Sequence, residues 1–169
     1  MKKYIVLFIL ISTFVCLEAK SLRRSTLPLL EIGPKASLYI SNDIALGIGA
    51  ELVCNPVRNI GIRLDVTELR FGGNTIFYLN CNSSLDGLFY IPMRGFEPYV
   101  HGGVGFMFVD NEGSAGSSTS FTMRFGMGGL FPINNRTNFF VEPGIVVEDL
   151  GDNTNAIFRL SFGARFGVL

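Results

Sequence analysis

The chain has 169 residues, of which 48% are hydrophobic and 17% charged, and it contains 20 glycines and 16 phenylalanines. This length suits a single domain, and a formal net charge of zero excludes the basic field that would attract nucleic acid. The high apolar content indicates that much of the surface faces something other than water.

The first 19 residues have the pattern of a secretory signal peptide. They read MKKYIVLFILISTFVCLEA, with two lysines, an apolar run from Tyr4 to Val15 and a small residue at Ala19. The run is well short of the roughly 20 apolar residues that a membrane-spanning helix needs. We therefore expect export and cleavage after Ala19, followed by a polar, extended leader over residues 20–30. Cys16 follows bulky residues, which argues against lipidation.

Cleavage would leave Cys54 and Cys81, an even pair in a compartment where disulfide bonds can form. On strands two apart in a sheet they would lie about 10 Å from each other, too far for a bridge. We expect two small apolar residues on the oily face of a sheet. No CxxC pair, histidine cluster or metal-ligand spacing accompanies them, so the sequence predicts neither a metal nor another cofactor.

From Glu31 onward, apolar and polar residues alternate with a period of two, which is typical of amphipathic β-strands. Turn residues separate the alternating segments. The expected strands are approximately 31–41, 44–54, 59–71, a fourth that ends near residue 90, 98–109, 119–131, 138–148 and 155–169.

The fourth strand is the least regular. Its apolar residues fall into two groups of opposite parity, Phe77, Leu79 and Cys81 against Leu88 and Tyr90. A β-bulge near Asp86 and Gly87 would bring both groups to one face.

The last strand shows the alternation most clearly. Its sequence, NAIFRLSFGARFGVL, sets Phe158 and Phe162 on one face and Arg159 and Arg165 on the other. A helix would bring Arg159 beside the phenylalanines and would contain several glycine or serine residues. An amphipathic strand at the end of a chain needs a partner on each edge, which closure of a barrel supplies. The pattern predicts one all-β domain over residues 31–169, an antiparallel up-and-down barrel of about eight strands.

The alternation does not reveal which face points inward. A soluble, lipocalin-like barrel that carries an apolar ligand would bury the oily face. Here the polar face is rich in glycine, serine and threonine, with isolated charges and few lysines, which suits a narrow lumen. Strands of about 11 to 13 residues, tilted by about 40°, also match the roughly 25 Å apolar band of an outer membrane. We therefore expect a transmembrane β-barrel with the oily face outward.

Three stretches carry a family resemblance: PYVHGGVGF at 98–106, FGMGG at 125–129 and RLSFGARFGVL at 159–169. Residues 31–169 resemble the small outer-membrane β-barrels of Gram-negative bacteria, the OmpA-like and OmpX-like proteins. The resemblance implies a monomer in the outer membrane, surrounded by its lipid and inserted by the barrel-assembly machinery through the C-terminal strand. Such families usually end on an outward aromatic residue, whereas this outward series ends at Val168.

Parity places a set of polar side chains inside the barrel: Lys35, Glu51, Arg63, Asp65, His101, Arg124, Glu142, Glu148, Arg159 and Arg165. Because an unpaired buried charge costs several kcal/mol, their near-balance of sign predicts a network of ion pairs. Glu142 is the expected hub, with Arg124 on the neighbouring strand as a partner, and Arg159 is expected beside Glu142 or Glu148. A narrow pore is the alternative, but an eight-stranded lumen is about wide enough only for its own side chains.

The aromatic residues are expected to meet the membrane. The phenylalanines expected to face lipid are Phe106, Phe108, Phe121, Phe125, Phe139, Phe158, Phe162 and Phe166. The tyrosines near strand ends, expected at the membrane interface, are Tyr39, Tyr78, Tyr90 and Tyr99.

His101 is the only histidine and the only candidate general base near neutral pH. A lipid A-modifying enzyme would need a serine near it, but its neighbours are Gly102 and Gly103. We expect a histidine of the lumen network and no enzyme. The favoured function is a structural, envelope-stabilising or adhesive role.

Overall fold

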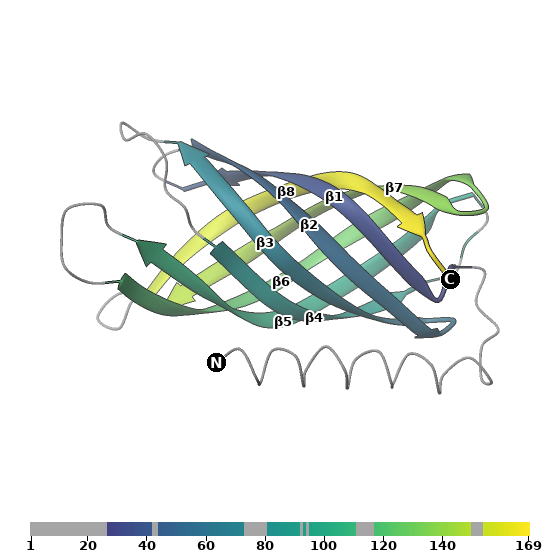
Figure 1. Ribbon diagram of the computed structural model, residues 1–169, viewed down its shortest axis with the longest axis horizontal. Coiled ribbons are helices and arrows are strands. Elements are labelled where there is room, and N and C mark those ends of the chain that lie inside the picture. Colours follow the sequence, from purple (N-terminus) through teal and green to yellow (C-terminus); the bar gives the residue numbers. More distant parts are fainter. Residues whose placement is uncertain are drawn as a thin grey trace.

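The computed structural model describes residues 27–41, 44–72, 81–91, 93, 95–110, 117–149 and 154–169. It shows a closed barrel in which each strand pairs antiparallel with the next and the last pairs with the first (Figure 1). The strands are β1 Leu30–Ile40, β2 Ile44–Val57, β3 Ile60–Gly72, β4 Cys81–Tyr90, β5 Glu97–Asp110, β6 Ser117–Asn134, β7 Thr137–Asp149 and β8 Thr154–Gly167. The predicted eight-stranded up-and-down barrel is confirmed.

The predicted signal peptide, residues 20–26 of the leader, Tyr78, Phe77 and Leu79 lie outside the described residues. Within the described residues, no helix has the length and apolar character needed to cross a membrane.

The two faces of the sheet differ in the way that the alternation predicts. Large apolar side chains stay exposed on the outside, such as Leu46 at 58% and Met127 at 63%. Charged side chains lie inside, and Glu51 and Arg124 are both 0% exposed. This distribution is the opposite of that in a soluble barrel with an apolar interior, and it is the one that a lipid-facing belt requires.

Strand β4 corrects the sequence-based prediction of a bulge. Its register with β5 runs without interruption from Cys81 opposite Phe108 to Tyr90 opposite Tyr99. Leu88 and Tyr90 therefore point inward and are buried. The inward side chains of this strand change from polar to apolar along its length. This change, and not a bulge, accounts for the shift of parity among the apolar residues.

The apolar part of the lumen lies at the turn end of the barrel, which we define by Leu29 and the connections β2–β3, β4–β5 and β6–β7. The side chains that form this mouth cluster are Leu27, Val53, Leu88, Tyr90, Tyr99, Leu130 and Phe140. Figure 1 shows the C-terminus at the same end. At the other end, the loop end, a smaller cluster consists of Tyr39, Val146 and Ile157. Polar side chains fill the lumen between the two clusters.

The two clusters also correct the prediction for the tyrosines. Tyr39, Tyr90 and Tyr99 are at most 2% exposed and lie inside the barrel, not at the membrane interface. Their parity is that of the inward residues, and parity outweighs the tendency of tyrosine to collect near strand ends.

The end of the leader is part of the folded barrel. Leu29 donates its N–H to the Leu169 carbonyl at 2.7 Å, and its own carbonyl accepts the Asn55 N–H at 2.8 Å. The Asn55 side chain also donates to the Pro28 carbonyl at 2.8 Å. Leu27 and Leu29 are almost completely buried. Residues 27–29 thus close the mouth, whereas the sequence predicts an extended polar leader there.

Replacing Leu27 with Ala should destabilise the barrel, because the shorter alanine side chain would leave a gap in the mouth cluster. A buried Leu→Ala change costs ~2 to 5 kcal/mol. The temperature at which the folded band shifts on a heated gel, in detergent, should fall. Ile133→Ala, at a site that is 67% exposed, is the matched control and should have a much smaller effect. Equal effects of the two variants would show that Leu27 does not hold the mouth closed.

Candidate functional site in the barrel lumen

All ten residues predicted for the lumen network are buried, and none is more than 5% exposed: Lys35, Glu51, Arg63, Asp65, His101, Arg124, Glu142, Glu148, Arg159 and Arg165. Two further carboxylates, Glu31 and Asp86, are equally buried but are absent from that prediction. Glu31 shares the parity of Lys35, which could have identified it. Asp86 was missed because a bulge was expected at that point.

Glu142 on β7 is one hub of the network. Its Oε2 accepts a hydrogen bond from Arg63 Nη1 at 2.5 Å and another from the Tyr99 hydroxyl at 2.8 Å. Its Oε1 accepts one from Arg159 Nη2 at 2.7 Å. These donors come from β3, β5 and β8, so one carboxylate ties three other strands to β7.

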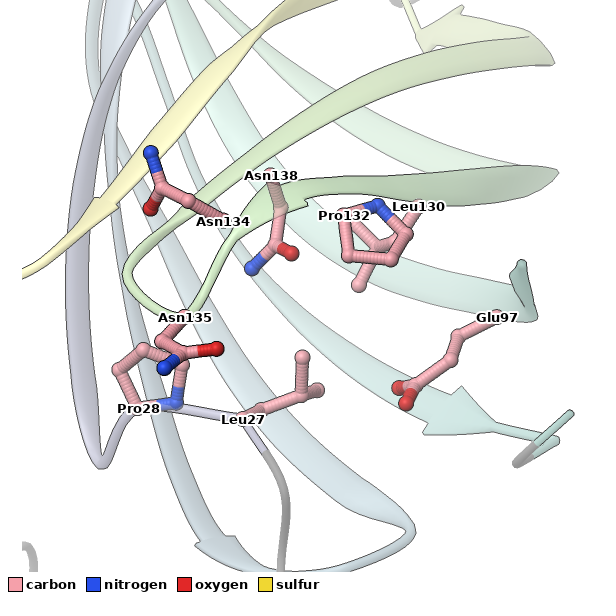
Figure 2. A pocket seen from close by; sticks show the side chains of 8 residues that line it. All are labelled: Leu27, Pro28, Glu97, Leu130, Pro132, Asn134, Asn135 and Asn138. Atoms are coloured by element: carbon pink, nitrogen blue, oxygen red, sulfur yellow. The ribbon is translucent and has the colours of Figure 1, made fainter. Parts of the chain in front are cut away.

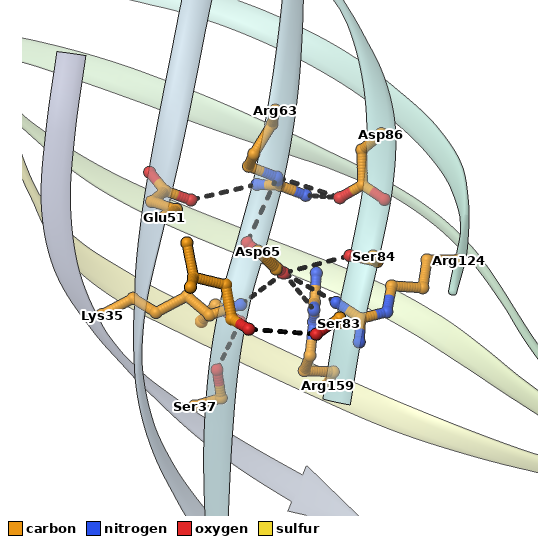
Figure 3. Close-up of polar contacts among 12 residues, drawn as sticks. Lys35, Ser37, Glu51, Arg63, Asp65, Ser83, Ser84, Asp86, Arg124 and Arg159 are labelled. Carbon is orange, nitrogen blue, oxygen red and sulfur yellow. Dashed lines mark hydrogen bonds and ion pairs between the residues drawn. The ribbon is translucent and has the colours of Figure 1, made fainter. Parts of the chain in front are cut away.

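Asp65 on β3 is the second hub (Figure 3). Its Oδ2 lies 2.6 Å from Lys35 Nζ and 2.7 Å from Arg124 Nη1. The Ser84 hydroxyl donates to the same oxygen at 3.3 Å. Within the described residues, the ion pair of Arg124 is with Asp65, and the predicted pairing with Glu142 is wrong. The alternation predicts that Arg124 points inward, but it does not give the register. In the register Arg124 lies opposite Val146, which is four residues along β7 from Glu142.

Arg63 connects the carboxylates to one another. Its Nε and Nη2 donate to Asp86 Oδ2 at 2.9 and 2.5 Å, while Nη1 donates to Glu142. Glu51 Oε2 lies 3.5 Å from the same Nη1. Because the carboxylates surround a single guanidinium, removal of Arg63 would leave several buried negative charges without their partner.

Arg165 joins the network to the mouth cluster. Its Nε donates to Glu51 Oε1 at 2.5 Å. Its guanidinium carbon lies 4.7 Å from the centre of the Phe140 ring and 5.3 Å from that of Tyr99. These distances fit cation–π contacts, which stabilise a desolvated cation.

A polar layer lies at the mouth itself. Glu31 accepts hydrogen bonds from the side-chain amides of Asn55 at 2.9 Å and Asn138 at 2.8 Å. A cavity of about 240 Å³ opens beside this layer, as Figure 2 shows, and its lining residues are Leu27, Pro28, Glu97, Leu130, Pro132, Asn134, Asn135 and Asn138.

His101 lies inside the charged network. Arg63 Nη2 is 3.2 Å from Nδ1, and because a guanidinium only donates, Nδ1 is the acceptor and the proton is on Nε2. Nε2 lies 3.3 Å from Glu142 Oε1. A general base must reach the proton that it removes, yet the His101 side chain is 0% exposed and faces two charged side chains.

The outward phenylalanines form part of the apolar belt. Those between 38% and 56% exposed are Phe106, Phe125, Phe139, Phe158, Phe162 and Phe166. Phe121 is half-buried, and its ring centre lies 5.8 Å from that of Phe106, edge to face. Phe108 is on β5, but its side chain lies outside the described residues.

The backbone register separates the two cysteines of the barrel. Cys54 lies opposite Ile62, and Ile62 lies opposite Gly87, so Cys81 is displaced by about 20 Å along β4. The two cysteines are therefore too far apart to bond to each other. Cys54 is nevertheless disulfide-bonded, contrary to the expectation of a plain apolar residue.

No protein-family model matches the chain, and no curated protein matches it. Solved structures that share its fold include two barrels of bacterial proteins. The N-terminal β-barrel domain of Pseudomonas aeruginosa OprF has a TM-score of 0.58 and 16% identity, covering 81% of this chain and 96% of that one. Neisserial surface protein A (NspA) has a TM-score of 0.54 and 14% identity, covering 82% and 95%. At the level of the fold, the resemblance to small outer-membrane barrels is confirmed.

Replacing Glu142 with Ala should lower the unfolding temperature in detergent, because Arg63 and Arg159, which are both buried, lose a shared acceptor. Breaking a buried pair costs ~3 to 5 kcal/mol. Arg159→Ala and the double variant complete a cycle in which the double loss should be smaller than the sum of the single losses. Additive losses, or an unchanged transition in Glu142→Ala, would show that water screens these charges.

Proposed function

We propose that the protein is a non-enzymatic barrel of the outer membrane of a Gram-negative bacterium, with a structural, envelope-stabilising or adhesive role and a lumen closed by its own side chains. The observation that carries this proposal is the combination of an apolar exterior with a charged interior in one closed sheet. Lipid would surround the barrel, and the barrel-assembly machinery would insert it through β8. We propose that it acts as a monomer and without nucleic acid.

The exterior supports the membrane location. A continuous surface of Ile, Leu, Phe, Met and Val side chains is unfavourable in contact with water and favourable in contact with the hydrocarbon of lipid. A closed sheet also has no open edge, so its backbone groups can cross hydrocarbon without unpaired donors.

The interior supports a closed lumen. β3 and β7 are four places apart in the ring of eight strands and therefore lie on opposite walls. The Arg63–Glu142 ion pair joins these walls at 2.5 Å, directly across the axis. The Arg124–Asp65 pair joins β6 to β3 at 2.7 Å. An ion that followed the axis would have to break both contacts.

The two ends of the barrel support an orientation. The connections at the turn end that the structure describes in full are short, as in β6–β7, where only 135–136 separate the strands. Residues 41–43, 73–80, 111–116 and 150–153 connect the strands at the loop end. We propose that the loop end faces outward and the turn end faces the periplasm, so that a rigid barrel presents these connections at the cell surface.

Protease treatment of intact cells followed by a carbonate wash tests location and orientation together. We expect the protein in the membrane pellet, with cleavage between residues 110 and 118 and none between 55 and 59. Recovery of uncleaved protein in the aqueous fraction would favour a soluble periplasmic barrel, and cleavage at 55–59 would reverse the orientation.

Planar bilayers test the closed lumen. The purified barrel should insert without steady single-channel currents, because side chains joined across the axis leave no continuous water path. A stable current in the wild-type protein would instead identify a narrow pore. Phe162→Arg, which should cost ~2 to 4 kcal/mol near the membrane midplane, is a control for insertion through the apolar belt.

A further inference from the structure

A groove of about 410 Å³ lies on the outer face of the barrel, over β5, β6 and β7. Val100, Met127 and Phe131, which line it, are exposed side chains of the apolar belt. Every lining residue is apolar or glycine except Tyr99, whose hydroxyl donates to Glu142 inside the barrel. The groove therefore offers no polar side chain to an occupant, and its volume is within the range of sites that hold small molecules.

Glycine at position 129 hollows the belt at this point. Gly129 has the parity of the exposed Phe131, so a side chain there would point outward. In the register it lies between Pro98 on β5 and Val141 on β7. The Phe96 ring packs on this glycine, where a Cβ atom would collide with it, and its centre lies 4.9 Å from that of the Phe131 ring. The groove is thus a hollow in the belt, bordered by two packed rings.

The groove lies within the depth of one leaflet of a membrane. Asn134 ends β6 at the turn, and Gly129 lies five residues before it. That separation gives roughly 13 Å of height at about 3.3 Å per residue and about 40° of tilt, which is about half of the roughly 25 Å apolar band. In the proposed orientation this half is the periplasmic leaflet.

An exposed cation lies at the rim of the same hairpin. Residues 135–136 join β6 to β7, and Arg136 is exposed. Its N–H donates to Asn134 Oδ1 at 2.9 Å, and its carbonyl accepts the Gly167 N–H at 2.6 Å, so the backbone that carries the guanidinium is held in place. A guanidinium binds phosphate with two parallel hydrogen bonds. The hairpin therefore combines an apolar groove with a cation at the rim, where lipid headgroups lie in the proposed orientation.

We propose that the groove binds one acyl chain of an anionic phospholipid, whose phosphate lies at Arg136. The inference rests on the proposed membrane location and adds a particular lipid site to it. An acyl chain has no polar groups to satisfy and enters the groove directly from the surrounding leaflet. A stable protein interface buries about 800 Å² per partner, whereas this hollow is local to one hairpin and the strand beside it.

Native mass spectrometry of the full barrel in detergent, with added phosphatidylglycerol, tests the acyl-chain site. The wild-type barrel should bind one lipid in a saturable way before any others. Val100→Phe places a ring in the groove and should need roughly tenfold more lipid. Val104→Phe is the matched control, because Val104 is also an exposed valine of β5 but does not line the groove. It should bind lipid as the wild type does.

A second pair of variants tests the headgroup. Arg136→Gln should weaken the binding of phosphatidylglycerol roughly fivefold and leave that of diacylglycerol, which has no phosphate, unchanged. Arg58→Gln is the control, since Arg58 is an exposed arginine in the turn between β2 and β3, which do not line the groove. Equal weakening by the two variants would overturn the placement of the phosphate at Arg136.

Two results would overturn the lipid site itself. Lipid binding without saturation, or an equal lipid requirement in Val100→Phe and Val104→Phe, would show that the belt holds lipid without selection. Dimers that Val100→Phe abolishes would assign the groove to a second copy of the chain. Fractionation of the same cells separates this inference from the proposed function: wild-type protein in the aqueous fraction contradicts the function, whereas membrane-bound protein with equal lipid binding in both valine variants contradicts only the site.

Discussion

The pairing of buried charge inside the barrel is the interaction on which the rest of the structure depends. Each strand of a closed sheet is already held by its two neighbours, but those hydrogen bonds do not determine what fills the centre. The carboxylates of Asp65 and Glu142 fill it by binding cations from β1, β3, β6 and β8. Contacts of this kind are stable only when nearly every charge has a partner, because the desolvation of an unpaired ion costs several kcal/mol.

The two apolar clusters explain how such a network can persist. The mouth cluster includes Leu27 from the leader, and Tyr39, Val146 and Ile157 lie at the loop end. Apolar layers on both sides limit the access of water, which strengthens attraction between the charges that they enclose and raises the cost of any unpaired donor. Residues 27–29, the belt and the network therefore depend on one another. Residues 27–29 cover the mouth, the belt excludes water from outside, and the ion pairs hold opposite walls together.

The comparison with OprF and NspA shows how little sequence this architecture demands. Identities of 16% and 14% accompany coverage of almost the whole length of both barrels. Alternation of apolar and polar residues, with turns at suitable intervals, is sufficient to specify closed strands of this kind, and many sequences meet it. Function depends on particular side chains grafted on the fold, so the lumen network and the connections at the loop end are where this protein can differ from others.

The sequence by itself determined the elements and their faces, because the side chains of a strand alternate with a period of two whatever the strand packs against. Phe162 outside and Arg159 inside follow from that rule alone. The sequence could not determine the offsets between strands or the contacts across the lumen, which depend on how eight registers combine around the ring. For that reason the sequence did not show that the partner of Arg124 is Asp65 on a distant strand. Nor did it show that β4 has no bulge, so that Leu88 and Tyr90 point into the barrel, or that Leu27 packs in the mouth cluster. Only the closed tertiary structure brings together residues that are far apart in the chain and not on adjacent strands.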